Sequence, residues 1–229
     1  MNHEHTLQRL DELIQSRSIL QHPFYKAWQR GELSVRQLAV YAKSYYPHVA
    51  SFPNYLRSAI AASRDAGIRE NLESNLADEL SNPAPHHELW LDFAAGLGVD
   101  RNDVTAAEPS TFASSTVGTF SRLAAGETAG AVAALYAYES QQPGVSKTKM
   151  DGLRRHYGVS DTRVLAYFEV HAEKDIEHSE GERQALLRCL ETGSREDVIL
   201  GSTKDALDAY WGLLDGICEE AVVSAVCER

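Results

Sequence analysis

The segment AGAVAALYAYES (129–140) is apolar on nearly every face that a helix would present. A helix that is hydrophobic all round is buried inside a protein, so this segment is expected to be a central helix with other helices packed around it. Its only acidic residue is Glu139. A buried carboxylate has to be paired or bound to a metal, unless Glu139, near the helix end, turns to solvent or to an arginine.

Apolar residues recur at helical spacing along the rest of the chain, and no convincing alternating strand is present. Pro47 and Pro53 should kink one long helix rather than end it, because the apolar stripe that starts after the N-cap Ser34 continues to Ile60. With 229 residues and no linker or repeat, one all-α domain over 1–229 is expected. Helices are predicted near 7–14 and 24–33, and over 34–60, 67–81, 86–97, 110–125, 128–142, 146–157, 161–191 and 203–226.

The run HAEKDIEH (171–178) sets His171, Asp175 and His178 at positions i, i+4 and i+7. At 3.6 residues per turn these three fall within about 60° on one helix face. Two imidazoles and a carboxylate converging in this way form half of a divalent-metal site, and they suit iron or manganese better than calcium or structural zinc. The alternative is a solvated acidic helix, since several glutamates lie in the same stretch.

A second pair of candidate ligands, Glu79 and His86, brackets the NPAP break at 82–85. Glu79 is expected to end one helix and His86 to open the next, and both can still point into one cavity. Each could equally be an ordinary surface residue. The combined set has about the right composition for two metals with positions left for oxygen, and it comprises Glu79, His86, Glu139, His171, Asp175 and His178.

Charge and hydropathy exclude several classes of partner. Lys and Arg number 22 against 33 Asp and Glu, a net charge of −11, and no basic cluster occurs, so a nucleic-acid partner is not expected. No run of about 18 apolar residues exists for a membrane span, and the N-terminus is charged, which favours a cytoplasmic protein. The stretch 206–226 is apolar enough to pack on a second subunit, so a homodimer is expected.

Several segments together resemble the heme-oxygenase-like di-metal oxidases, and most closely their CADD-type branch, which is related in fold to PqqC and TenA proteins. The resemblance implies an all-α, heme-oxygenase-like bundle of seven to eight helices. The family's ligand pattern of Glu, six residues, His, then Glu, then His-x3-Asp-x2-His is filled at all six positions named above, which implies an Fe/Fe or Mn/Fe centre with O2 as co-substrate. The segments are HPFYKAWQRGELS (22–34), YAKSYYPHVASFPNYL (41–56), NLADE (75–79), HHELW (86–90), YAYESQQP (136–143) and HAEKDIEH.

The resemblance also implies an unusual reaction, in which the protein oxidises one of its own tyrosines and converts it to p-aminobenzoate for folate synthesis. Tyr25 matches the sacrificed tyrosine, and Lys149 matches the amino donor, with Lys147 two residues away as the other possibility. A phenol held beside the metals would gain the advantage of an intramolecular reaction, and an amine in an apolar pocket would be nucleophilic. Three further tyrosines match pocket positions and could relay electrons or protons, namely Tyr41, Tyr138 and Tyr167.

Other functions fit the residues less well or stay open. A ferritin-like site needs Glu-x-x-His, which the chain lacks, and a thiaminase needs a cysteine on the helix at 128–142, which has none. Cofactor-free quinone-forming oxidases of this fold lack the complete carboxylate set. A di-iron oxidase acting on an external substrate stays open, as does a non-enzymatic death-domain-binding module, which would need an exposed apolar groove. An external reductant is possible, and His22, His48 and His156 are expected to be structural.

Overall fold

The computed structural model describes residues 3–221, and these form helices without any strand, as expected. Counting the short α2 and α6, there are eleven α-helices among them, more than the seven to eight expected. The helices are α1 (His3–Ser16), α2 (Pro23–Arg30), α3 (Val35–Ala62), α4 (Ala66–Ser81), α5 (His86–Gly96), α6 (Arg101–Thr105), α7 (Thr111–Ala124), α8 (Thr128–Glu139), α9 (Gln142–His156), α10 (Thr162–Glu191) and α11 (Glu196–Glu220), with a 3₁₀ turn at Ile19–Gln21.

Local sequence fixes many of the helix starts. Ser34 and Gln37 form a capping box at the start of α3, which satisfies backbone N–H groups that the first turn leaves unpaired. The helix continues through Pro47 and Pro53 to Ala62, as the apolar stripe predicts. His22, expected to be structural, caps α2 by accepting a hydrogen bond from the Phe24 N–H.

Several elements differ from the prediction. The first helix is longer than predicted, and α2 and α8 each end three residues early, at Arg30 and Glu139. The five-residue α6 was not predicted, because a single turn is too short to show an apolar stripe. Helix α9 begins at Gln142, four residues early, since a proline in the first turn of a helix loses no hydrogen bond. Helix α11 begins at Glu196 rather than 203, where burial of Ile199 secures its first turns. The predicted extension over 222–226 lies outside the described residues.

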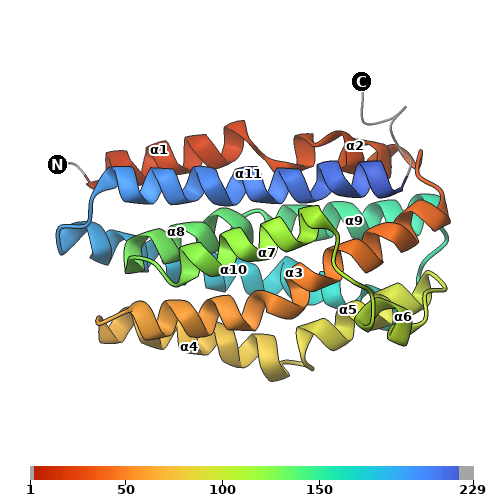
Figure 1. Cartoon of the computed structure of the whole chain (residues 1–229), viewed down its shortest axis with the longest axis horizontal. Helices are drawn as coiled ribbons and strands as arrows, with labels where there is room; N and C mark the ends of the chain where they lie inside the picture. The colour runs from red at the N-terminus through yellow and green to blue at the C-terminus, as the bar shows by residue number, and fades with distance from the viewer. Residues whose placement is uncertain (1–2, 222–229) are drawn as a thin grey trace.

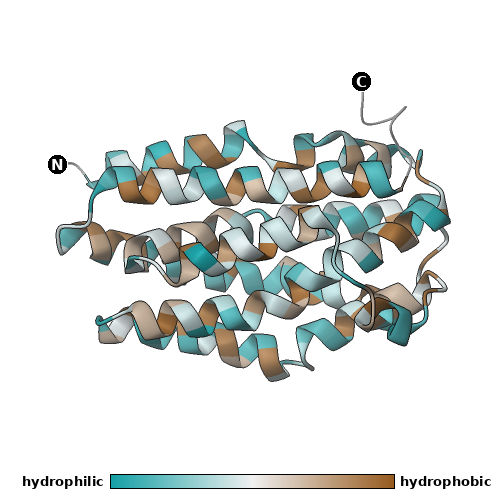
Figure 2. Cartoon of the chain, viewed as in Figure 1, coloured by the Kyte–Doolittle hydropathy of each residue, from teal (hydrophilic) through white to brown (hydrophobic). Residues whose placement is uncertain are grey.

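The long helices run roughly parallel in layers (Figure 1). α1 and α11 lie side by side at one face and α3 and α4 at the opposite face, with α7, α8 and α10 between them. Helix α8 packs on α11, α10 and α7, and every residue from Ala129 to Glu139 is buried. The apolar segment is therefore the central helix, as expected. The outer helices carry both hydrophobic and hydrophilic residues (Figure 2).

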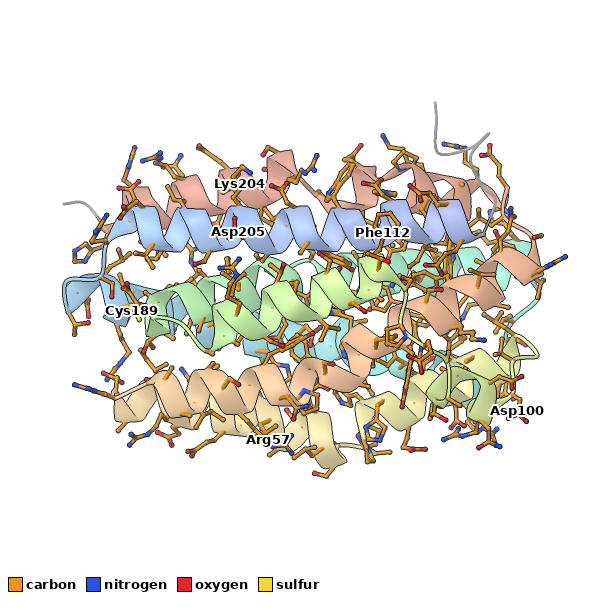
Figure 3. The ribbon with its side chains drawn as sticks, in the orientation of Figure 1. Arg57, Asp100, Phe112, Cys189, Lys204 and Asp205 are labelled. Atoms are coloured by element: carbon orange, nitrogen blue, oxygen red, sulfur yellow. The ribbon has the colours of Figure 1, made fainter. Side chains whose placement is uncertain are left out.

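The outer surface carries most of the charge. Arg57, Asp100, Lys204 and Asp205, labelled in Figure 3, are all exposed. Asp205 pairs with Arg122 at 2.9 Å, an exposed contact of the kind that contributes little to stability. None of the described helices has an apolar stretch long enough to cross a lipid bilayer.

Candidate metal centre and tyrosine cluster

The first group of candidate ligands is Glu79, His86 and His171, contributed by the end of α4, the start of α5 and the middle of α10. Glu79 Oε1 lies 2.9 Å from His86 Nδ1 and 3.6 Å from His171 Nε2. The two imidazole rings are 4.7 Å apart between centroids. One ligand atom from each residue lies within 4.8 Å of the others, and all three side chains are buried.

The second group is Glu139, Asp175 and His178, contributed by the end of α8 and by α10. His178 Nδ1 lies 3.3 Å from Asp175 Oδ1 and 3.5 Å from Glu139 Oε1. The Asn75 side-chain amide donates to both oxygens of Glu139 at 2.9 and 3.0 Å. The three residues at positions i, i+4 and i+7 of α10 therefore belong to different groups. His171 belongs to the first group, and Asp175 and His178 belong to the second.

Each histidine has one ring nitrogen committed to a fixed acceptor outside its group. His86 Nε2–H donates to the Asn82 carbonyl at 3.1 Å, and His171 Nδ1–H donates to the Tyr167 carbonyl at 2.7 Å. His178 Nε2–H donates to Asp78 Oδ2 at 3.0 Å. These bonds leave the other nitrogen of each ring facing the carboxylates, which is how metal-binding histidines are oriented in proteins.

The electrostatics of the first group fit a cation. Burial alone would raise the pKa of Glu79, but hydrogen bonds from His171 and His86 outweigh it and lower the pKa to about 2. Burial alone would lower the pKa of His171, but the charges of Asp175 and Glu79 raise it to about 9. The proton that His171 holds in this setting thus carries positive charge that a metal ion would supply in its place.

The second group holds more negative charge than its histidine can balance. Burial raises the pKa of Asp175 to about 6, and its Oδ2 atom has no hydrogen-bond partner among the described residues. Burial would lower the pKa of His178, but hydrogen bonds to Asp175 and Glu139 raise it to about 11. An unpartnered buried carboxylate oxygen beside a second carboxylate is a site that a divalent cation would stabilise.

Glu182 is a buried carboxylate, whereas the alternative of a solvated acidic helix would have left it exposed. It lies one helical turn after His178, its side-chain oxygens have no hydrogen-bond partner among the described residues, and burial with the charge of Glu139 raises its pKa well above the usual range. The signal available in the sequence was its spacing of seven from Asp175, which puts both on one face of α10.

A small cavity lies against both groups, between α3, α4, α8 and α10. Tyr138 and Tyr167 line it, as expected for pocket tyrosines, but Tyr25 and Tyr41 do not. Helix α2, which carries Tyr25, packs on α9, and the expectation that Tyr25 lies beside the metals stays a prediction. The lining residues are Val49, Phe52, Glu79, Tyr138, Glu139, Tyr167, His171 and Asp175.

Tyr25 belongs instead to a buried cluster that also contains Lys149. The Tyr25 and Tyr41 hydroxyls are 3.2 Å apart, and Lys149 Nζ donates to the Tyr41 hydroxyl at 2.6 Å. Lys149 Nζ also lies 4.9 Å from the centroid of the Tyr25 ring. Burial lowers the pKa of Lys149 well below its usual range, whereas Lys147 is exposed.

Two further tyrosines, Tyr45 and Tyr210, join this cluster and were not singled out from the sequence. The Tyr45 hydroxyl is 3.0 Å from that of Tyr138, which lines the cavity. Gln142 donates to the Tyr210 hydroxyl at 3.1 Å. In sequence both look like ordinary helix-core aromatics, because only the packing of α3 against α11 brings their hydroxyl groups to the others.

Comparison with known proteins agrees with this geometry. Residues 39–211 match the family model described as iron-containing redox enzyme. The chain is 40% identical to the 4-aminobenzoate synthase of Chlamydia muridarum, over 94% of this chain and 91% of that one, and 37% identical to the 4-aminobenzoate synthase of Nitrosomonas europaea, over 97% and 94%. A protein of heme oxygenase-like fold from Shewanella denitrificans superposes with a TM-score of 0.78 at 16% identity, covering 96% and 93% of the two chains.

The solved structure supports the fold alone, and the sequence relatives support the family. Both agree with the resemblance seen in the sequence. The two buried groups of candidate ligands support a dinuclear metal site. The chain therefore belongs to the family of iron-containing redox enzymes, together with the 4-aminobenzoate synthases, and has their heme-oxygenase-like helical fold.

Proposed function

We propose that this protein is an oxygen-dependent di-metal oxidase that forms p-aminobenzoate from its own Tyr25. Relatives that are 37 to 40% identical over nearly the whole chain carry the name 4-aminobenzoate synthase. The observation that carries the proposal is the pairing of Lys149 with Tyr25 in the core, with Nζ 4.9 Å from the ring centroid. Burying an amine without a carboxylate partner costs stability, and the proposed reaction accounts for the place of Lys149 in the core.

The metal centre would be held by the two ligand groups. Iron, alone or with manganese, would supply electron transfer to dioxygen when bound. The first group offers two imidazoles and one carboxylate, and the second offers two carboxylates and one imidazole. Because manganese favours oxygen ligands more than iron does, a mixed centre would place manganese at Glu139, Asp175 and His178.

The chain's own residues would prepare the nitrogen transfer. Burial favours the uncharged amine of Lys149, which is the nucleophilic form, by lowering its pKa. The hydrogen bond to Tyr41 fixes the amine against the Tyr25 ring, so the two groups would react as neighbours in one molecule. The buried setting of both side chains keeps competing water away from them. Lys149, rather than the exposed Lys147, is therefore the proposed amino donor.

An isotope experiment tests the origin of the product. The protein would be produced with ring-13C tyrosine, stripped of metal, reloaded with iron and manganese, and exposed to oxygen and a reductant without any added substrate. We expect p-aminobenzoate that carries the tyrosine label. Unlabelled product, or oxygen consumption without product, would favour the alternative of an external small-molecule substrate.

The remaining expectations from sequence stay predictions: a homodimer, an external reductant and a cytoplasmic location. The death-domain-binding alternative needs an exposed apolar groove. Among the described residues the exposed large hydrophobic side chains are Val35, Leu80 and Ile176, which lie on different helices. This scatter supports the enzyme over the binding module.

A further inference from the structure

Glu182 is a buried carboxylate that lies beside the second ligand group and belongs to neither group. Its side chain is 2% exposed, and neither of its oxygens has a hydrogen-bond partner among residues 3–221. The cation next to it in the chain, Arg183, pairs instead with Asp11 at 2.7 Å. Burying a charged group without a partner is costly, so this position calls for a positive partner that the described side chains do not supply.

The carboxyl group of Glu182 faces that of Glu139. The two groups lie close enough for a hydrogen bond, yet carboxylates only accept, and no donor from the described residues reaches the oxygens of Glu182. Glu139 is held in place by the Asn75 amide, which donates to both of its oxygens at 2.9 and 3.0 Å. Two buried carboxylates that meet in this way repel each other unless a cation compensates them.

Helix α10 directs Glu182 toward the second group. Asp175, His178 and Glu182 are separated by three and four residues, so they share one face of the helix. Side chains on a helix lean toward its N-terminus, so the long side chain of Glu182 reaches back toward the turn that carries His178. Glu139 meets this face from the end of α8, which packs on α10. Glu182 is therefore placed to reach a cation held by the second group.

The charge of the whole centre gives a second reason to include this residue. With neutral imidazoles, the six candidate ligands carry three negative charges, from Glu79, Glu139 and Asp175. Two divalent cations carry four positive charges. The carboxylate of Glu182 supplies a fourth negative charge and makes the buried centre neutral, which a core of low dielectric constant favours. Dinuclear sites in ferritin-like bundles likewise use four carboxylates.

We propose that Glu182 is a seventh ligand of the metal centre, which binds the second metal together with the three residues of the second group. This inference rests on the metal centre of the proposed function. The second metal would then have three carboxylates and one imidazole, an oxygen-rich set that suits manganese(II). In the metal-free protein the same residue destabilises the core, because its carboxyl group lacks a partner there.

Stability and metal affinity together separate a ligand from a residue that only fills the core. The variants are Glu182→Met, Glu182→Gln and the matched control Glu180→Gln, which removes a charge from an exposed position of the same helix. The metal-free proteins would be unfolded in urea, and manganese(II) would be titrated into each by calorimetry without oxygen. We expect Glu182→Met to be more stable than the wild type without metal, to bind one equivalent normally, and to bind the other at least about tenfold more weakly.

The other two variants set the scale of the effect. Glutamine keeps the shape of the side chain and one acceptor oxygen, so Glu182→Gln should bind the weakened equivalent more tightly than Glu182→Met does. Glu180→Gln should match the wild type in both stability and affinity. If Glu182→Met loses helical content, Glu182→Gln carries the same test, because its side chain fills nearly the same volume.

The visible absorption of the cobalt(II)-loaded protein reports the ligand itself. Loss of a carboxylate ligand changes the coordination of one cobalt ion, so the bands should shift in Glu182→Met and stay as in the wild type in Glu180→Gln. Unchanged affinity and spectrum in Glu182→Met, or equal weakening of both equivalents, would overturn the proposal. A wild-type protein that binds no metal would contradict the proposed metal centre as a whole, and Glu182 could then be no ligand.

Discussion

Lys149 Nζ lies 4.9 Å from the centre of the Tyr25 ring, and the two side chains are only 2% and 1% exposed. No carboxylate among the described residues forms an ion pair with this lysine, whose polar partner is the Tyr41 hydroxyl. Placing an unpaired amine in the core costs stability. The buried amine of Lys149 therefore destabilises the protein at the position where the proposed reaction needs an uncharged nucleophile. Active sites commonly contain groups that lower the stability of the fold in this way.

Lys149→Met should stabilise the metal-free protein and remove part of its pH dependence. The pKa of Lys149 is lowered in the folded state, so the unfolded chain binds more protons between the folded pKa and 10.5. Wild-type stability should therefore rise with pH through that window. The increase in the free energy of unfolding caused by Lys149→Met should be largest below the pKa that Lys149 has in the folded protein. It should amount to about 1.4 kcal/mol for each pH unit between that pKa and 10.5, and it should fall to zero as the pH approaches 10.5. Urea unfolding between about pH 6 and pH 10 measures the free energy of unfolding across this window.

The control for that prediction is Lys147→Met. This side chain is exposed, so its replacement should change the free energy of unfolding by no more than about 0.5 kcal/mol and leave the pH slope as in the wild type. Product should be lost in Lys149→Met and kept in Lys147→Met. If the free energy of unfolding depends on pH equally in the wild type and in Lys149→Met, the pKa of Lys149 is not lowered by folding.

His171→Ala and Asp175→Ala should each abolish stoichiometric metal loading. Both residues contribute ligand atoms from the interior of α10, one to each group, and alanine is a strong helix former, so the fold should persist. Metal analysis and circular dichroism report the two properties separately. Glu173→Ala, at an exposed position of the same helix, should load fully. Full loading in either ligand variant would refute the assignment.

Tyr25→Phe should keep both metals and form no product. Phenylalanine preserves the ring packing of α2, and the lost hydroxyl contact to Tyr41 costs only about 1 kcal/mol. Product assay and metal analysis on one sample measure both outcomes. Tyr46→Phe is the matched control, since Tyr46 is half-buried on α3 outside the cluster and should keep product. Product from Tyr25→Phe would mean that another residue or an added molecule is the substrate.

Asp78→Ala should weaken metal binding chiefly at the second group. Asp78 reaches the first group only through Asn82, whose side-chain amide donates to Asp78 at 2.8 Å and whose carbonyl accepts from His86. Asp78 accepts the hydrogen bond from His178 Nε2–H at 3.0 Å and touches neither His86 nor His171. Loss of such an orienting carboxylate usually costs about 10- to 100-fold in metal affinity. Asp78→Asn keeps an acceptor oxygen and should bind more tightly than Asp78→Ala. Titration of the metal-free protein should resolve one wild-type equivalent and one weakened equivalent, and two unchanged equivalents would contradict the orientation of His178.

The sequence predicts the architecture and the ligands for reasons that are local. A fully apolar helix with one acid must be central and must satisfy that acid, and the spacing of His171, Asp175 and His178 puts them on one face of a helix whatever packs against it. The six candidate ligands are accordingly brought into two buried groups. Glu79 and His86 lie on either side of the NPAP segment that separates α4 from α5. Their contact does not follow from their spacing alone, because it depends on the angle at which the two helices meet.

The features that could not be predicted depend on packing between distant segments. The position of Tyr25 outside the cavity follows from where α2 docks, and the burial of Glu182 follows from how α10 packs against α8.

The central claim is that the chain is its own substrate, and product stoichiometry together with intact mass tests it most directly. The loaded wild-type protein would be given oxygen and reductant, and p-aminobenzoate would be counted per chain while mass spectrometry follows residue 25. We predict at most one equivalent of product per chain, with a matching loss of mass at Tyr25. Several equivalents from chains of unchanged mass would contradict this account and establish turnover of an external substrate.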